Sequence, residues 1–354
     1  MSMKAGITIL VCTYNGARRL PSTLRCIAAQ QIPAHIACQL IVVNNASTDN
    51  SEEVIRREWQ QYDTAIQLEI ISEPTPGLTF AREAGFRAAL YDFIILCDDD
   101  NWLSPEYVQK AFALMESQPE IGILGGKGNF VFEKPAPAWL LSCNLYAGGP
   151  QASESGKVID QLVYGAGAVL RKSAWEKIRA GGFVPALSDR TGINLSSGGD
   201  HELCYVLALA GYKIWYDDSL HFDHYIMANR LTLPYYLKYI EESAHCFSVL
   251  EPYKILLKTQ NSSIVSFRWE LFKSFWFHIK KLSVLVFTNT SGSKSPDDRV
   301  LRKLQYTLLK QRLRSYRRLS LFEDNFSKAV SLQNELLRNG GYSLSSNYQQ
   351  SGQV

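Results

Sequence analysis

The first hundred residues alternate between short apolar runs and amphipathic segments, and this alternation limits the fold more than any other feature of the chain. Four apolar runs have the length and composition of strands buried on both faces: 7–11, 39–43, 67–71 and 92–97. Three helical patterns lie between them: 18–30, 51–61 and 79–90. Because parallel strands need crossover connections, the alternation predicts a mostly parallel, Rossmann-like α/β sheet flanked by helices.

Polar residues follow the predicted strands at the points where they end. Thr13-Tyr14-Asn15-Gly16 follows the first, 44–49 follows the second, and Asp98-Asp99-Asp100 follows the fourth. The carboxyl ends of parallel strands meet at one edge of a sheet, and ligands of such sheets bind there. We therefore expect the functional site at this edge.

The pattern changes along the chain and predicts three regions. Further strands are expected at 121–128, 161–170 and 212–217, with a helix from about 200 to 210. From 230 onward the pattern is helical and aromatic, and the last residues are polar. The predicted regions are an α/β domain, a helical C-terminal appendage and a disordered tail: 1–228, 229–340 and 341–354.

Composition excludes several classes of protein. With 46% hydrophobic residues among 354, the chain is too apolar to be disordered. We expect no transmembrane helix and no secretory leader, because apolar stretches are short or interrupted by charges. The seven cysteines form no CxxC pair, which argues against a zinc ribbon and favours reduced thiols in a cytoplasmic protein.

The net charge of +3 conceals an uneven distribution. Residues 299–318 hold eight basic and no acidic side chains, which leaves the rest of the chain mildly acidic. Together with the aromatic, lysine-containing stretch 267–287, this predicts a basic amphipathic element that binds peripherally to an anionic membrane at its inner, cytoplasmic face. A helical appendage packed on the catalytic domain or on a second subunit is the alternative. Nucleic acid is disfavoured, because the basic residues occupy one short element.

Three adjacent carboxylates at the end of a buried strand are the strongest local sign of chemistry. Asp98, Asp99 and Asp100 repel one another unless a cation sits beside them, and a divalent metal with oxygen ligands would do so. A solvated acidic turn or a helix cap is the alternative. Arg82, on the preceding helical segment, is either a surface residue or a fixed cation for phosphate oxygens.

A second group of candidates lies beyond residue 190. Asp200 follows a Gly/Ser-rich loop and starts a helix, so it is either an N-cap or a general base, with Glu202 as the fallback base. His221 and His224 have i,i+3 spacing. Each is a core or surface histidine in the plainer interpretation, and His224 is a metal or phosphate ligand in the sharper one.

These pieces, in this order, resemble family 2 glycosyltransferases, inverting enzymes with the GT-A fold. The resemblance covers roughly residues 5–225. Six segments carry it: TILVCTYN at 8–15, VVNNASTD at 42–49, PGLTFAR at 76–82, LCDDDN at 96–101, YGAGAVLR at 164–171 and GGDHELC at 198–204.

The resemblance implies roles for individual residues. The resemblance implies that the donor is bound by Thr13, Tyr14, Asn15, Asn44, Arg82, Asp98 and Asp99. It also implies that Asp100, Asp98 and His224 bind the metal and that Asp200 is the catalytic base. Three positions depart from the family: Asn44 lies where an aspartate usually reads the base, Gly199 replaces a glutamate, and Val206 replaces an arginine.

The resemblance also implies a reaction. A nucleoside-diphosphate sugar, with a UDP-sugar favoured, would donate its sugar to a glycan or lipid-linked glycan acceptor in bacterial surface-glycan synthesis, with Mg²⁺ or Mn²⁺ as cofactor. The processive Gln-x-x-Arg-Trp motif is absent, so one sugar is expected per binding event. A non-catalytic glycan-binding or scaffolding protein of the same fold is the alternative. A nucleotidyltransferase is a third hypothesis, and the lack of a Gly-rich phosphate loop after the first strand argues against it.

Overall fold

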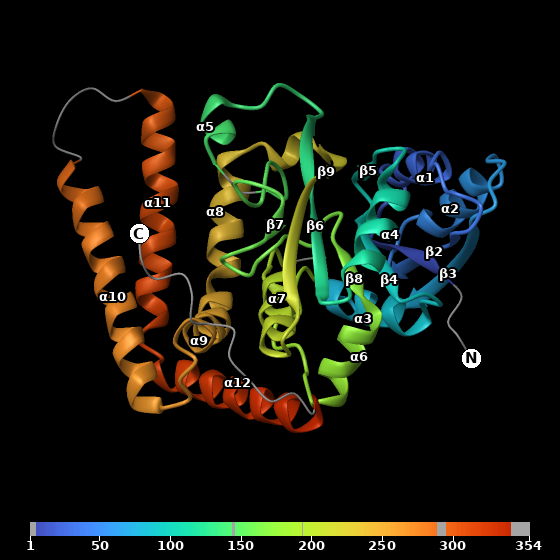
Figure 1. Ribbon diagram of the computed structural model, residues 1–354. Helices are drawn as coiled ribbons and strands as arrows, with labels where there is room; N and C mark the ends of the chain where they lie inside the picture. The colour runs from blue at the N-terminus through green and yellow to red at the C-terminus, as the bar shows by residue number, and fades with distance from the viewer. Residues whose placement is uncertain (1–4, 144–145, 193, 289–294, 341–354) are drawn as a thin grey trace.

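A single mixed β-sheet forms the centre of the computed structural model, which describes residues 5–143, 146–192, 194–288 and 295–340 (Figure 1). The strand order is β3-β2-β1-β4-β8-β6-β9-β5, with β7 paired to β9. The strands are β1 (Gly6–Thr13), β2 (Ala37–Asn45), β3 (Gln67–Glu73), β4 (Phe93–Asp98), β5 (Asn101–Leu103), β6 (Ile121–Phe132), β7 (Gly156–Lys157), β8 (Val169–Arg171) and β9 (Lys213–Ile226).

The N-terminal half of the sheet confirms the predicted parallel α/β arrangement. β1 pairs in parallel with both β2 and β4, and β2 pairs in parallel with β3. The connecting helices are α1 (Leu20–Ala28), α2 (Ser51–Trp59) and α3 (Leu78–Ala88). Thr13, Asn45 and Asp98 end their strands, so the predicted polar clusters lie at one edge.

The second half of the sheet is mixed. β8 is antiparallel to β4 and β6, β5 and β7 are antiparallel to β9, and β6 is parallel to β9. The helices here are α4 (Tyr107–Ser117), α5 (Ala138–Leu141), α6 (Lys172–Ala180) and α7 (Gly199–Leu209). The strand expected at 161–170 is wrong for most of its length: only β8 forms, because Gln161 and Gly167 have positive φ and turn the chain.

Helices cover both faces of the sheet, and alternate residues of each central strand point into different layers. Ile7, Ile9 and Val11 pack with α1 and α4 on one side. Leu10 packs on the other side, in a layer that also holds residues of α3, α6, α7 and α9. Burial on both faces explains why the strands read as continuous apolar runs rather than alternating ones.

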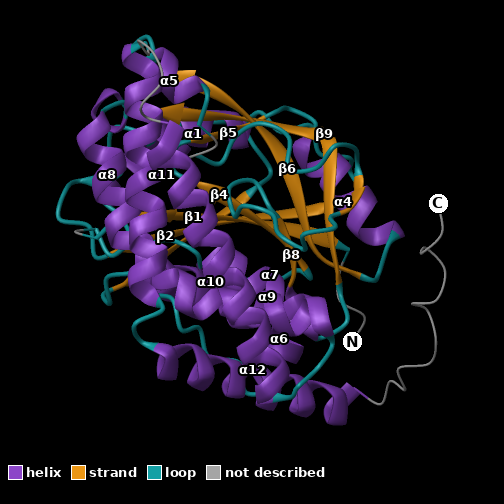
Figure 2. Ribbon diagram, turned by 90° about the vertical axis from the view of Figure 1, so that its left-hand side faces the viewer, coloured by secondary structure: helices purple, strands orange, loops and turns teal. Residues whose placement is uncertain are grey.

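Helices dominate the C-terminal region, and they pack against the α/β part of the molecule rather than lie apart from it (Figures 1 and 2). They are η1 (Ala228–Arg230), α8 (Leu233–Glu242), η2 (Ser243–His245), α9 (Cys246–Thr259), α10 (Ile264–Phe287), α11 (Pro296–Ser315) and α12 (Leu319–Gly340). Buried side chains of α9, α10 and α12 belong to the same core layer as Leu10. The region division at 228 stays a prediction, and the expected tail, 341–354, lies outside the described residues.

No helix in the described part of the chain has the length and apolarity needed to cross a membrane.

Candidate active site

A cavity of about 1250 Å³ opens at the carboxyl edge of the sheet. Its walls include the ends of β1 and β4, the loop before α7, the end of β9, and helices α8 to α11. Most of the predicted site residues line it: Thr13, Tyr14, Arg82, Asp98, Asp99, Asp100, Asp200 and His224. The sheet topology therefore brings together residues that lie more than two hundred positions apart in the sequence.

The middle aspartate of the cluster is held by protein groups. Arg19 donates to both carboxylate oxygens of Asp99, each at 2.7 Å, and the Thr13 hydroxyl donates to Oδ2 at 2.6 Å. A fork of two parallel N–H donors is the strongest way for an arginine to hold a carboxylate. Gly16 is required here, because a Cβ would lie 2.5 Å from Asp99 Oδ2. In this structure the side chains of Thr13 and Asp99 are therefore hydrogen-bonded to each other.

The third aspartate faces a histidine and an arginine. Asp100 is buried, with Oδ1 3.6 Å from His224 Nε2 and Oδ2 3.1 Å from Arg230 Nη1. Burial by itself raises the pKa of Asp100, but His224 and Arg230 outweigh it and hold that pKa below its ordinary value. Antiparallel pairing of β5 with β9 places residues 101 and 224 opposite each other, which sets this geometry.

The ring of His224 is oriented by a backbone carbonyl. Its Nδ1 lies 2.8 Å from Ala147 O, and a carbonyl only accepts, so Nδ1 carries the hydrogen. Burial lowers the pKa of His224, and Asp100 opposes that fall. In its neutral form the ring presents the lone pair of Nε2 toward Asp100. Two ligand atoms that face each other at 3.6 Å without a hydrogen bond fit a shared divalent cation.

Among the described residues no cluster of three or more His, Cys, Asp or Glu side chains could hold a metal by itself. A metal bound here would therefore take only one or two protein ligands, as Mg²⁺ usually does beside substrate phosphates. Asp100 and His224 supply the facing pair, and Asp98 lies on the same edge.

Arg82 occupies the centre of the carboxylate group. It is buried on α3, forms a close ion pair with Asp200 Oδ1, and lies 3.9 Å from both Asp98 Oδ1 and Asp189 Oδ2. Burial by itself lowers the pKa of Arg82, but the surrounding carboxylates raise it above its ordinary value. Burial also raises the pKa of Asp98, although Arg82 opposes that rise. A permanently charged guanidinium is thus fixed at the cavity wall.

The carboxylate of Asp200 lies at the start of α7 between two donors. Arg82 binds Oδ1, and the Gly165 backbone N–H donates to Oδ2 at 2.8 Å. Burial by itself raises the pKa of Asp200, but Arg82 and Gly165 outweigh it and keep the group ionised. Asp200 is consequently available to accept a proton rather than to donate one.

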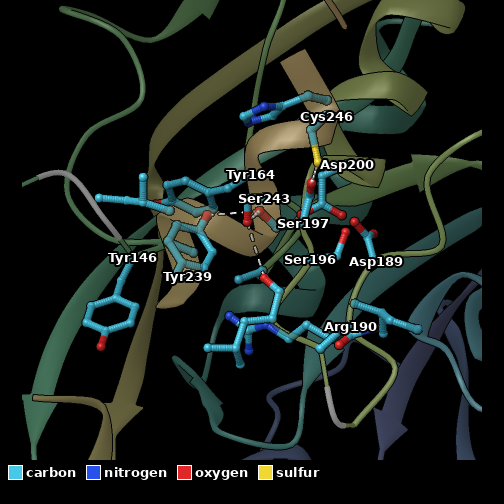
Figure 3. A pocket seen from close by; sticks show the side chains of 18 of the residues that line it. Tyr146, Tyr164, Asp189, Arg190, Ser196, Ser197, Asp200, Tyr239, Ser243 and Cys246 are labelled. Carbon is cyan, nitrogen blue, oxygen red and sulfur yellow. Dashed lines mark hydrogen bonds between the residues drawn. The ribbon is translucent and has the colours of Figure 1, made fainter. Parts of the chain in front are cut away.

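Asp189 stands beside Asp200 in the cavity wall (Figure 3). Its Oδ1 accepts a 2.7 Å hydrogen bond from Gly199 N, and its Oδ2 faces Arg82. A Cβ at position 199 would lie 2.3 Å from Asp189 Oδ2. Asp189 therefore supplies a carboxylate next to Asp200. That carboxylate occupies the space that a side chain at position 199 would need.

The loops after β1 and β2 are joined by Asn15. Its side-chain oxygen accepts from Thr48 N at 2.8 Å, and its backbone N–H donates to Ser47 Oγ at 3.0 Å. Asn44 does not line the cavity, and its Oδ1 is buried with no hydrogen-bond partner among the described residues. Asn45 lines the cavity instead, while its amide holds Gly77 N and two backbone carbonyls.

The Gly/Ser-rich loop before α7 is fixed against the C-terminal helices (Figure 3). Ser197 Oγ lies 2.9 Å from Tyr239 Oη and 3.2 Å from Ser243 Oγ, and Ser196 Oγ lies 3.2 Å from His245 Nε2. The C-terminal region thus helps to position Asp200, because the pinned loop leads directly into the first turn of α7.

Sequence reasoning missed three charged residues of this site: Arg19, Asp189 and Arg230. Each meets its partner only through the tertiary fold, and no local motif marks any of them. Four residues singled out from the sequence lie outside the cavity lining: Asn15, Asn44, Glu202 and His221. Glu202 is buried and accepts from Ala186 N and Leu187 N, and His221 is exposed on β9.

Comparisons with known proteins agree with this arrangement. Residues 8–179 match the model of glycosyl transferase family 2. Over 122 residues, or 34% of this chain, the sequence is 27% identical to chondroitin synthase of Escherichia coli and 30% identical to hyaluronan synthase of Pasteurella multocida. These matches span only 17% and 12% of those proteins.

A solved structure shares the fold over most of its length. It is a mannosyltransferase of Pyrobaculum calidifontis in complex with GDP-mannose and Mn²⁺, with a TM-score of 0.53 and 16% sequence identity. The likeness covers 95% of this chain and 86% of that one. At this identity it shows the fold alone, the GT-A sheet with its flanking helices.

Proposed function

This chain belongs to glycosyltransferase family 2, and we propose that it transfers one sugar per binding event from a nucleoside-diphosphate sugar to an acceptor hydroxyl, with inversion. One observation carries the proposal. Arg82, a buried cation, stands between Asp200 and Asp98 at the wall of a single cavity. A fixed cation for the diphosphate and an ionised base are the two groups that a direct displacement at an anomeric carbon requires.

The donor would occupy the part of the cavity near the ends of β1 and β4. Tyr14 is partly exposed there and offers a ring against which a base can stack. Asn44 would contribute if the base reached its unpaired Oδ1, since the imide N–H of uracil is a matching donor. A UDP-sugar is the favoured donor in this proposal, although the mannosyltransferase of similar fold was solved with GDP-mannose.

We further propose that Asp100 and His224 would hold Mg²⁺ or Mn²⁺ together with the donor's phosphate oxygens, with Asp98 close by on the same edge of the sheet. The carbonyl-fixed ring of His224, with its lone pair toward Asp100, supports this assignment. When bound, the cation would stabilise negative charge on the departing diphosphate. Arg230, which pairs with Asp100, adds a permanent positive charge at the same place.

Asp200 is the proposed catalytic base. Arg82 and Gly165 fix its carboxylate, and the charge of Arg82 keeps it ionised. It would take the proton from the acceptor hydroxyl as that oxygen attacks the anomeric carbon from the face opposite the diphosphate. Arg82, which contacts Asp200 and lies beside Asp98, would bind the diphosphate and so couple the leaving group to the base.

The same geometry weighs against the non-catalytic alternative. Its support in the sequence is the loss of two family residues, at positions 44 and 199. Asp189 supplies a carboxylate next to Gly199 and faces Arg82, so the negative charge absent from position 199 is present in space. We therefore favour a working enzyme.

The acceptor class and the place of action are proposed from the relatives of this chain and from its C-terminal helices. The matched relatives include a chondroitin synthase and a hyaluronan synthase, so a glycan or lipid-linked glycan acceptor is the proposed class. We propose a cytoplasmic enzyme of bacterial surface-glycan synthesis that works at the inner face of the membrane, supported by the basic and aromatic helices described below.

A panel of nucleotide sugars tests the proposal by thermal shift, with Mg²⁺, with Mn²⁺ and with a chelator. At least one donor should raise the melting temperature only when metal is present, because a ligand of the folded state stabilises it. His224→Gln should abolish the metal-dependent part of the shift, whereas His221→Gln, an exposed histidine on the same strand, should not. If no nucleotide sugar shifts the wild-type protein, the proposed function fails.

A further inference from the structure

The cavity has a second arm that the proposed donor site does not use. Beyond the Gly/Ser-rich loop it continues between α9, α10 and α11. Apolar side chains form about half of its walls, including Leu250, Phe277 and Leu308. Phe277 and Leu308 are also exposed, so the arm has an apolar mouth open to solvent. The residues that line the whole cavity extend from the carboxylates at the carboxyl edge of the sheet to α10 and α11.

One cation in this arm is oriented without a counter-ion. Arg312 Nη1 lies 3.2 Å from His278 Nε2, and its guanidinium stacks over the ring of Phe247 with its carbon 5.4 Å from the centroid. No ion pair found among the described residues includes Arg312. An arginine fixed against neutral groups presents its remaining donors to a ligand.

His278 is the neutral hydrogen-bond acceptor that orients Arg312. Its Nδ1 lies 2.8 Å from Ser274 O, so that nitrogen carries the hydrogen and Nε2 accepts from Arg312. Burial and the nearby Arg312 lower the pKa of His278. Glu251 also lines the arm, but its carboxylate accepts from Ser274 Oγ at 2.6 Å, and Lys254 adds a second cation. The arm thus combines apolar side chains with two cations, Arg312 and Lys254, and one carboxylate, Glu251.

We infer that this arm binds the acceptor, and that the acceptor carries a phosphate group next to an apolar chain. The apolar walls would take the chain, and Arg312 would bind the phosphate through paired N–H donors. The inference rests on the proposed function for the identity of the ligand as an acceptor, whereas the binding site itself stands on the geometry of the arm.

Binding of farnesyl diphosphate, measured by calorimetry in the presence of a chelator, tests the inference. Without divalent metal the donor half of the cavity should hold a diphosphate poorly, so binding reports the arm. Arg312→Gln should weaken binding by about tenfold to a hundredfold, the usual effect of losing a charge-assisted contact. Arg314→Gln, an exposed arginine on the same helix, should bind as the wild type does.

Farnesol and inorganic pyrophosphate separate the two parts of the ligand, and each should bind more weakly than farnesyl diphosphate. The inference is overturned if the wild type does not bind farnesyl diphosphate, if Arg312→Gln binds it equally, or if pyrophosphate competes as well as the whole molecule. Arg312→Lys, which keeps the charge, should retain part of the affinity and guards against a folding defect. The donor-induced thermal shift should survive in Arg312→Gln, so failure of the donor site is recognised separately.

An independent feature of the same helices concerns the outer surface. α10 is the outermost helix in Figure 1, and Val265, Trp269, Phe272 and Trp276 follow one face of it at three- and four-residue spacing. All four are exposed, with Trp269 at 60% and Trp276 at 53%. Exposed aromatic side chains in one row are unusual on a soluble surface and mark a binding face.

The neighbouring helix supplies positive charge. On α11 and the turn after it, Arg299, Lys303, Lys310, Arg314 and Arg317 are exposed at helical spacing. The ion pairs of the described residues include none of them. Lys273 and Lys281 of α10 lie over the rings of Trp269 and Phe277.

We propose that the α10–α11 face docks on an anionic lipid membrane. Trp and Phe side chains would enter the interface while unpaired cations meet lipid headgroups, which matches the charge of the face. The mouth of the acceptor arm belongs to the same pair of helices, so a lipid-anchored acceptor would reach the cavity without leaving the membrane.

Co-sedimentation with vesicles tests the docking face. The protein should bind phosphatidylcholine vesicles weakly and bind more strongly when phosphatidylglycerol is included, with salt reversing the gain. Trp269→Ser with Trp276→Ser should abolish binding, and Lys303→Gln with Lys310→Gln should remove the preference for anionic lipid. Leu90→Ser, an exposed apolar residue outside α10 and α11, should change nothing. The proposal is overturned if the tryptophan variant sediments in the absence of lipid. It is also overturned if the wild type is a dimer and the tryptophan variant is a monomer.

Discussion

Gly165 lies where any side chain would meet the carboxylate of Asp200, the proposed catalytic base. A Cβ at this position would lie 2.4 Å from Asp200 Oδ1 and 2.6 Å from Oδ2. Gly165 is not among the residues with positive φ, so alanine can adopt its backbone conformation without strain. The substitution Gly165→Ala therefore acts through the position of Asp200.

The size of the effect follows from the contact distance. An ordinary contact begins at 3.4 Å, so the carboxylate must move by about 1 Å from its present 2.4 Å. A displacement of that size in a catalytic group costs on the order of a hundredfold in rate. The move would also weaken the contacts of Asp200 with Arg82 and with Gly165 N. We expect Gly165→Ala to fold normally and to lose about a hundredfold in turnover.

Release of the nucleoside diphosphate from the donor measures that loss, and a double-mutant cycle assigns its cause. Asp200→Asn alone should cost about 10²- to 10⁴-fold. In that background Gly165→Ala should change the rate by only a few-fold, because the group it displaces no longer acts as a base. Wild-type turnover in Gly165→Ala, or an undiminished further loss on top of Asp200→Asn, would refute the reasoning.

Three other substitutions test the supporting network. Arg19→Gln should lower the free energy of unfolding by about 3–5 kcal/mol in urea, since it leaves Asp99 buried without its partner, and a loss below about 1 kcal/mol would contradict this. Asp189→Asn should keep the fold, because Asn tolerates the positive φ and still accepts from Gly199 N, whereas Asp189→Ala should lose about 1–3 kcal/mol in the same assay. Burial raises the pKa of Glu202 to about 7, so its contribution to stability is present below pH 4.5 and is lost as pH rises through 7. Unfolding measured from pH 4 to 8 should therefore show wild type losing up to about 3 kcal/mol relative to Glu202→Gln, and parallel curves would exclude the shift.

The N-terminal half of the fold could be predicted because its signals are local. Continuous β-branched runs such as 7–11 are buried on both faces of the sheet, and the polar residues after them lie at one edge, as parallel pairing requires. The strand expected at 161–170 failed for a local reason too. Positive φ at Gln161 and Gly167 is a property of turns that the apolar pattern did not reveal.

The missed residues of the site share a different cause. Arg19 meets Asp99 across 80 positions and Arg230 meets Asp100 across 130, so only the folded chain brings these charges together. Asp189 reaches Gly199 from a loop with no motif. The sequence marked the carboxylates because they are adjacent, but it could not show which cations neutralise them.

The basic C-terminal element illustrates the same limit. Its charge was evident from composition, and its packing was not. Arg302 caps carbonyl and hydroxyl groups at the end of α10, and Arg312 turns into the cavity, while the other basic side chains of α11 point outward. One charged segment thus divides into a structural part, a proposed acceptor contact and a proposed membrane surface.

Metal-dependent release of a nucleoside diphosphate, compared between wild type and Asp200→Asn, tests the central claim most directly. The wild type should release it from one nucleotide sugar with Mg²⁺ or Mn²⁺ and stop when the metal is chelated. Asp200→Asn should keep the donor-induced thermal shift and lose about 10²- to 10⁴-fold in release. An Asp200→Asn protein that turns over at the wild-type rate would contradict the account.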